Sequence, residues 1–181
     1  MKNYIFELKS VENIKQEIIG ESSKIFNFPK SVTFPFDDLY KQVVTKIKTL
    51  HISSECILYN SVEANNETKE FSDKSYWNEN ITEEEIKNYW IIGQNGQGDL
   101  WIMGIDNRIY FYDLDTEELS KQNFTELNID FGQWLQFAYL NKQLDAIYNE
   151  DKYNEMIGKD YKEKLMEISK ELLENYPYDI P

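Results

Sequence analysis

The sequence has little of the chemistry that catalytic and metal sites need. Cys56 is the single cysteine and His51 the single histidine among 181 residues. A lone cysteine excludes an internal disulfide and is typical of a reducing compartment, so we expect a cytoplasmic protein. A zinc site takes several histidine or cysteine ligands, and one of each is too few. A catalytic pair of Cys56 and His51 is an alternative, but a buried structural cysteine is the favoured interpretation.

Long apolar runs and basic residues are also scarce. No stretch reaches the roughly 18 apolar residues of a membrane span, and the N-terminus lacks the apolar core of a signal peptide. There are 19 lysines and arginines against 33 acids, for a net charge of −14. This acidity disfavours nucleic acid and anionic membranes as partners. It favours a basic protein partner, or merely a solvated surface.

The negative charge is concentrated in the middle of the chain. Residues 51–100 carry three lysines and ten acids, for −7, and residues 101–140 carry two basic residues and seven acids, for −5. Aromatic residues are plentiful at 15%, with 13 tyrosines, and apolar residues make up 41%. A disordered chain would be poor in aromatics, so we expect a folded protein. The length suits one domain over residues 1–181.

The region from 89 to 115 organises the chain. Three short apolar runs, at 89–92, 100–105 and 109–112, are rich in Ile, Tyr, Phe and Trp and are separated by turn residues. These residue types fit the pleated surface of a sheet. The turn at 106–108 is too short for anything but a tight reversal, and its Asn tolerates the left-handed conformation. The sequence therefore predicts a three-stranded antiparallel meander.

The glycine-rich loop at 93–99 is predicted to be a structural turn. A phosphate-binding loop leads into a helix and, in its commonest form, carries a lysine. Here the glycines lead into another apolar strand and no lysine follows. Glycine permits the backbone to turn between strands, and Asp99 is expected to bond to backbone amides within the loop.

Helical periodicity surrounds this region, and the predicted fold class is α+β, a mainly antiparallel sheet flanked by helices, two of them C-terminal. Capping residues support helices after Ser10, Thr82 and Asp130. The expected helices cover residues 11–18, 36–50, 83–88, 131–148 and 159–175, the expected outer strands cover 4–8 and 55–62, and residues 26–36 form an extended connection. The polar stretch 63–80 is predicted to be a loop.

Carboxylates are densest at 83–85 and 113–118. The second group does not match a calcium loop, because its sixth position is Glu118 and its twelfth is Phe124. A weak divalent site, a pair of catalytic acids and a solvated sheet edge are the alternatives to a contact surface for a basic partner. The sheet face that the C-terminal helices do not cover is expected either to be buried by the N-terminal helices or to remain partly exposed as an aromatic binding surface.

The central region resembles the SUKH superfamily, the group that includes the yeast cell-wall-assembly regulator and many bacterial immunity proteins. The resemblance rests on the apolar strand and Gly-rich turn at 89–99, the aromatic strand ending in an acid at 109–113, and the Phe-Gly-Gln-Trp-Leu helix start at 131–135. It covers residues 88–140, and the first half lacks the Leu-Pro and Asn-Gly elements common in the family. The resemblance implies an α+β fold and no enzymatic activity, and no metal or cofactor is expected.

The resemblance further suggests an immunity protein that binds and neutralises a bacterial toxin domain, with a basic nuclease as the expected type. The alternatives are a regulatory or scaffold module with a different protein partner, and an enzyme acting through carboxylates. The residues expected to contact the partner are Trp101, Tyr110, Tyr112, Asp113, Asp115 and Glu117.

Overall fold

A computed structural model describes residues 5–20, 25–78, 80–116 and 118–176. The α-helices in these ranges are α1 (Val11–Ile19), α2 (Asp38–Val44), α3 (Ser61–Phe71), α4 (Glu83–Ile86), α5 (Phe131–Asn149), α6 (Glu155–Ile168) and α7 (Lys170–Asn175). The strands are β1 (Leu50–His51), β2 (Ile57–Leu58), β3 (Tyr89–Gln94), β4 (Leu100–Gly104), β5 (Ile109–Tyr112) and β6 (Thr125–Glu126), and two short 3-10 turns are η1 (Lys74–Tyr76) and η2 (Lys121–Asn123). The predicted α+β class is confirmed.

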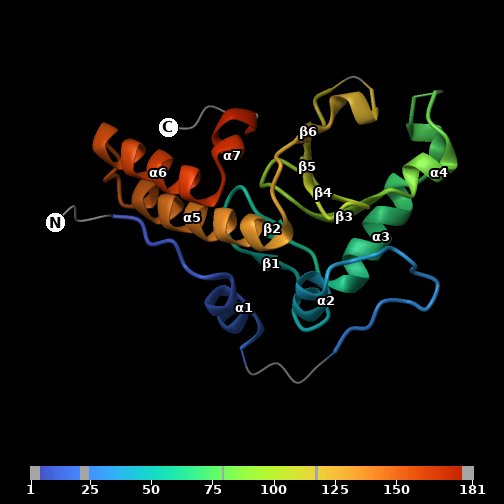
Figure 1. Cartoon of the computed structure of the whole chain (residues 1–181), viewed down its shortest axis with the longest axis horizontal. Helices are drawn as coiled ribbons and strands as arrows, with labels where there is room; N and C mark the ends of the chain where they lie inside the picture. Colours follow the sequence, from blue (N-terminus) through green and yellow to red (C-terminus); the bar gives the residue numbers. More distant parts are fainter. Residues whose placement is uncertain (1–4, 21–24, 79, 117, 177–181) are drawn as a thin grey trace.

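The strands form one antiparallel sheet in the order in which they occur along the chain (Figure 1). β3, β4 and β5 are its long members, and they pair Ile91 with Ile102 and Ile102 with Tyr110. The predicted meander over 89–115 is therefore confirmed. Asn107 turns the chain between β4 and β5 at a φ of 62°, the left-handed conformation that Asn tolerates.

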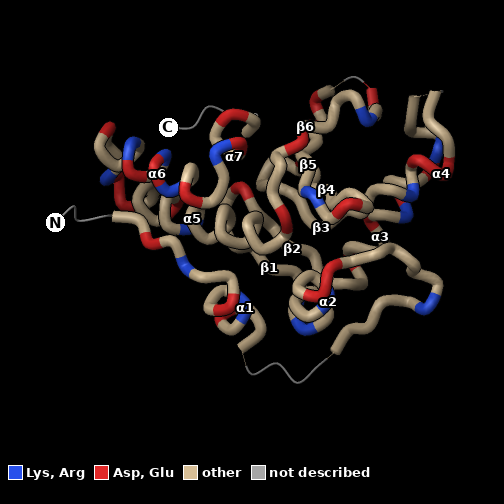
Figure 2. Tube along the Cα trace, viewed as in Figure 1, with Lys and Arg blue, Asp and Glu red and all other residues tan. Residues whose placement is uncertain are grey.

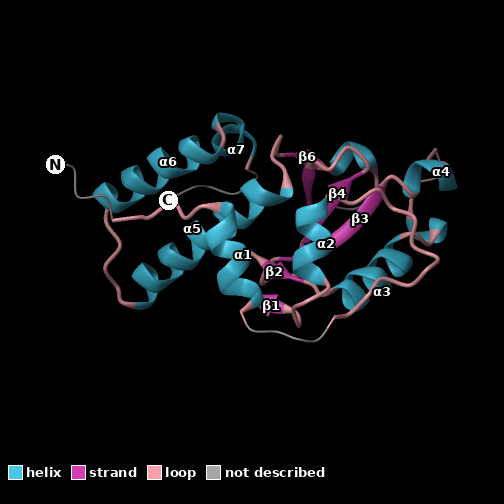
Figure 3. Cartoon of the chain, turned by 60° about the horizontal axis from the view of Figure 1, so that its bottom comes forward, coloured by secondary structure: helices cyan, strands magenta, loops and turns pink. Residues whose placement is uncertain are grey.

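One face of the sheet packs on α5. The Trp101 ring of β4 lies 5.9 Å from the ring of Trp134 and 5.9 Å from that of Phe137. α6 packs in turn on α5, where the Tyr161 hydroxyl donates to Asn141 Oδ1 at 2.8 Å. The C-terminal helices cover this face as the sequence predicts, with α5 in direct contact and α6 behind it (Figure 3).

The opposite face carries a cluster of aromatic rings and is also covered. Tyr89 of β3 lies 5.0 Å from Phe124 and 6.3 Å from Trp77, and Tyr112 of β5 lies 5.4 Å from Phe124. Phe124 and Trp77 come from the segments around η2 and η1, while α3 lies along β3 (Figure 3). The covering elements are therefore α3 and these two segments.

The prediction of a loop over 63–80 is wrong, because α3 occupies residues 61–71. Asn60 caps the helix, its Oδ1 accepting from the amides of Val62 and Glu63. The buried face consists mainly of small or polar residues, including Ala64, Asn65 and Thr68, so the sequence shows no apolar stripe. Packing against β3 stabilises a helix that composition does not reveal.

Several predicted boundaries also need correction. The helix expected over 36–50 ends at Val44, and β1 follows from Leu50. The strand expected over 55–62 shrinks to β2, because the chain turns into α3. The last helix begins at 155 and breaks at Ser169, whose backbone is extended with a φ of −162° and a ψ of 134°. Residues 5–8 form no strand, and Tyr4 lies outside the described residues.

The predicted caps and the extended connection are confirmed. The Ser10 hydroxyl caps α1, and Thr82 and Asp130 each form a capping box at α4 and α5. Residues 26–36 contain no helix or strand. Within the ranges that the structure describes, no helix combines the length and apolar character needed to cross a membrane.

Candidate functional site

The glycine-rich loop between β3 and β4 is a structural turn. Asn95 organises it, because its Oδ1 accepts from the amides of Gln97 and Asp99, each at 2.9 Å. Gly98 adopts a φ of 101°, which a side chain would strain. The Gly96 amide donates to the carbonyl of Ser54 at 2.7 Å, which ties the loop to the turn between β1 and β2.

Asp99 links this loop to the next turn of the sheet. Its Oδ2 accepts from the Asn95 side-chain amide at 2.9 Å, and its Oδ1 accepts from the backbone amide of Leu114 at 3.0 Å. The turn after β5 therefore supplies a backbone amide that bonds to Asp99. Asp99 is buried, so its carboxylate positions Leu114 and is not itself a surface group.

Residues 113–116 form what we call the acidic turn. The Asp113 Oδ1 accepts from the amide of Asp115 at 2.8 Å, and the Asp113 carbonyl accepts from the Thr116 hydroxyl at 2.7 Å. Leu114 and Asp115 are exposed, and neither Asp113 nor Asp115 forms an ion pair with a described residue. The turn thus presents two carboxylates and one apolar side chain from a fixed backbone.

The six residues predicted to contact the partner do not lie on one surface in the structure. Trp101 and Tyr112 are buried in the core, which contradicts their expected outward orientation. Tyr110 is half-buried, and burial raises the pKa of its hydroxyl to about 12. Asp113 and Asp115 lie together on the acidic turn, and Glu117 lies outside the described residues. Trp101 points inward because it shares a sheet face with Met103, which α5 covers.

Leu114 is a surface residue that was not predicted as a partner contact. Its side chain is 51% exposed although it is large and apolar. It lies near the glycine loop, where a Cβ on Gly98 would be 3.9 Å from its Cδ1. An apolar residue between two acids directly after a predicted strand was the available signal.

The acidic turn continues into a wider acidic end of the molecule. Glu118 accepts from the Asn78 side-chain amide at 2.7 Å, and Trp77 pairs with Leu119 as an isolated bridge. The Lys121 ammonium bonds to Glu85 of α4 at 2.7 Å. α4 and the chain around η2 therefore lie side by side, at the right of Figure 2.

Arg108 and Lys121, two of the basic residues of this region, are already engaged in ion pairs. Arg108 contacts Glu126 at 2.6 Å and Lys121 contacts Glu85 at 2.7 Å. Glu83 and Glu118 are exposed and form no ion pair with another described residue. The exposed charge at this end is therefore predominantly negative.

The Cys56–His51 pair does not have the properties of a nucleophilic site. Cys56 is fully buried, and burial raises the pKa of its thiol well above the ordinary value. A protonated thiol is a poor nucleophile. His51 is exposed in β1, where it pairs with Ile57. The favoured prediction, a buried structural cysteine, is confirmed.

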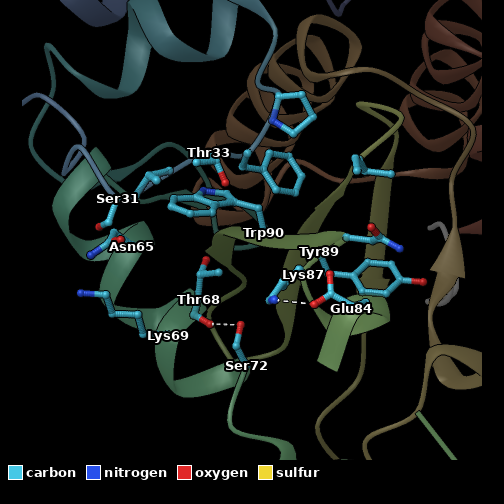
Figure 4. Close-up of a pocket in the computed structure, with 15 residues that line it drawn as sticks. Ser31, Thr33, Asn65, Thr68, Lys69, Ser72, Glu84, Lys87, Tyr89 and Trp90 are labelled. Atoms are coloured by element: carbon cyan, nitrogen blue, oxygen red, sulfur yellow. Dashed lines mark hydrogen bonds and ion pairs between the residues drawn. The ribbon is translucent and has the colours of Figure 1, made fainter. Parts of the chain in front are cut away.

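A groove of about 500 Å³ lies between α3, the start of β3 and the extended segment 31–35 (Figure 4). Trp90, Phe34 and Tyr89 line it and contribute aromatic rings to its wall. Its volume falls within the range of small-ligand sites. This site was not predicted from the sequence, because Asn65, Thr68 and Lys69 line it from the helix misassigned as a loop.

The polar part of the groove contains one carboxylate and two ammonium groups. Glu84 and Lys87 pair at 2.7 Å, while Lys69 forms no ion pair with any described residue. The groove therefore lacks the two converging acids that a carboxylate enzyme would use. Glu67, whose pKa burial raises, does not line it.

No three His, Cys, Asp or Glu side chains converge as metal ligands in the part of the chain that the structure describes. Comparison of the chain with family models, with curated proteins and with solved structures found no match.

Proposed function

We propose that this protein is a non-enzymatic binding protein that recognises a basic protein through its acidic end, and that it serves as an immunity protein against a toxin domain. The observation that carries the proposal is the acidic turn, where exposed Leu114 stands between two carboxylates that have no ion-pair partner in the described chain. A basic nuclease domain is the partner class that this charge suits best.

The shape of the acidic turn favours binding. Interfaces gain most of their affinity from a few apolar anchors that a partner desolvates, and charges around the anchor direct the encounter. Leu114 is the anchor, and Asp113 and Asp115 flank it. Because backbone hydrogen bonds from Asp115 and Leu114 hold the turn in place, little conformational entropy is lost on association.

In this mechanism the protein inhibits the toxin domain only by occupying its surface. An acidic surface that covers the nucleic-acid site of a basic nuclease excludes its substrate by sterics and by like charge. The chain supplies no reacting group, and the partner is released unchanged. Association should therefore be stoichiometric and fast at low salt.

The test is co-expression with any toxin domain encoded next to this gene, followed by binding measurements on the purified pair; the lack of a neighbouring toxin that is bound or neutralised would refute the immunity role. We expect growth to be restored and the pair to associate one to one. Leu114→Ala should weaken binding ~10-fold, and Asp113→Asn with Asp115→Asn should slow association ~10-fold at low salt and flatten its salt dependence. Asparagine keeps the oxygen that accepts from the Asp115 amide, so the turn persists.

A matched control removes two charges elsewhere. Asp151→Asn with Glu155→Gln neutralises two exposed acids at the turn between α5 and α6, at the opposite end of the molecule (Figure 1). Asn suits the positive φ of 53° at position 151. Equal slowing in the control and in the acidic-turn variant would refute a directed interface, and survival of binding in the Leu114 variant would refute the anchor.

A further inference from the structure

The first half of β3 has an open edge beside the groove. β2 pairs only with Gly93 and Gln94. The Ile105 amide donates to Asn88 O at 2.8 Å and the Gly104 amide donates to Arg108 O at 2.9 Å. In an antiparallel ladder this alternation makes Tyr89–Gly104 a non-hydrogen-bonded pair. The amide and carbonyl of Tyr89 therefore point away from β4.

A side chain already takes the place of a neighbouring strand farther along this edge. The Ile91 amide donates to the Thr68 hydroxyl of α3 at 2.9 Å. Tyr89 lies two residues earlier, so its backbone groups point to the same side, toward α3. No residue that the structure describes bonds to the amide or the carbonyl of Tyr89. An unpaired strand edge is a template for adding another strand.

Asn65 provides a second, independent observation. Asn65 is only 5% exposed and lines the groove, beside Ser31 in Figure 4. Its side-chain amide makes no hydrogen bond with any residue that the structure describes. Neither polar atom of this amide is sealed from solvent, so the amide opens into the groove. A primary amide has donors and an acceptor. The N–H and C=O of a ligand's peptide group can therefore both bond to it.

The charges in the groove indicate the sign of the ligand. Lys69 is exposed on α3 without an ion-pair partner among the described residues, whereas Glu84 is neutralised by Lys87. An incoming carboxylate therefore meets an available ammonium group. The rings of Trp90 and Phe34 provide an apolar surface for the stem of the same ligand.

We propose that the groove binds an extended peptide segment with an acidic side chain, which adds as a short strand to the open edge of β3. Tyr89 pairs with the peptide backbone, Asn65 bonds to one of its peptide groups, and Lys69 binds the carboxylate. This site is distinct from the acidic turn and selects the opposite charge.

The experiment is selection of a random octapeptide library displayed on phage against the full chain. Synthetic versions of the enriched peptides are then studied by amide hydrogen exchange. We expect enriched sequences to contain Asp or Glu between β-forming residues and to slow exchange of the Tyr89 amide at least 10-fold. Enrichment of no peptide, or protection confined to another segment, would overturn the proposal.

Three variants connect binding to the groove. Asn65→Leu removes the amide and preserves side-chain size, and Lys69→Glu reverses the charge; each should weaken the selected peptides at least 10-fold. Lys48→Glu, an exposed lysine outside the groove, is the matched control and should bind as the wild type does. Melting curves verify that each variant is folded. Unchanged binding by folded Asn65→Leu would refute the site.

Discussion

Gly93 lets β2 and β3 approach more closely than a side chain would allow. A Cβ at this position would lie 2.0 Å from the carbonyl oxygen of Ile57, a backbone atom. The register also shifts between Ile91 and Gly93, where β3 carries a bulge. The residue is therefore required by the approach of two backbones and not by a ligand.

Gly93→Ala should lower the free energy of unfolding by at least ~2 kcal/mol, because backbone must move to relieve the clash. Urea denaturation of the wild type and of the variant measures this difference in the free energy of unfolding. Gly96→Ala is the control from the same loop: its Cβ would lie 3.0 Å from Ser54 O, so a smaller loss is expected. Equal stability of Gly93→Ala and the wild type would contradict the close approach.

Trp101 acts in the core, where its indole Nε1 donates to the Glu55 carbonyl at 2.8 Å. Trp101→Phe should lower the free energy of unfolding by ~2–3 kcal/mol through lost packing and this hydrogen bond. It should leave partner affinity unchanged in the folded protein. Exposed Leu114→Ala should instead weaken partner binding and change the free energy of unfolding by less than ~0.5 kcal/mol. Denaturation and binding assays on both variants test the assignment.

At the scale of elements, the short helix α4 depends for its stability on its cap and on a contact with a distant segment. α4 is only four residues long, too short to be stable alone. Its capping box closes its first turn, and the Lys121–Glu85 pair attaches it to the chain around η2. The hydrogen bond from Lys121, then those from the Thr82 amide and hydroxyl, lower the pKa of Glu85 from 4.5 to about 2.

This lowered pKa predicts how α4 responds to acid. The stabilisation is fully present above the unfolded pKa of 4.5 and is lost as the pH falls toward about 2. Glu85→Gln keeps the capping box but removes the charge. The melting temperature of the wild type should therefore exceed that of the variant at pH 6, and the difference should shrink as the pH falls from about 5 to 2. A difference that is constant with pH would contradict the ion pair.

At the scale of the whole molecule, sheet and helices share one core. Trp101 of β4 contacts Trp134 of α5, and Asp145 of α5 accepts from the Ser54 amide at 2.7 Å in the turn between β1 and β2. We expect the chain to unfold as one cooperative domain. Far-ultraviolet circular dichroism and tryptophan fluorescence should report the same urea midpoint. Separate midpoints would indicate that the helices and the sheet unfold independently.

The sequence determined the elements whose signals are local. Alternating apolar residues and short polar turns specified the three long strands, and the capping residues Ser10, Thr82 and Asp130 marked true helix starts. The lack of a Walker lysine and a following helix correctly assigned the glycine loop to turn geometry. The sequence also placed Asp113 and Asp115 directly after the third long strand, and their role as partner contacts stays a prediction.

Only the tertiary structure decided what depends on packing between distant segments. Trp101 is buried because α5, more than 25 residues later, covers its side of β4; alternation in sequence gives two faces but does not say which is covered. α3 is a helix because β3 buries its small polar face. Burial, and with it the groove around Asn65, is a property of the assembled layers.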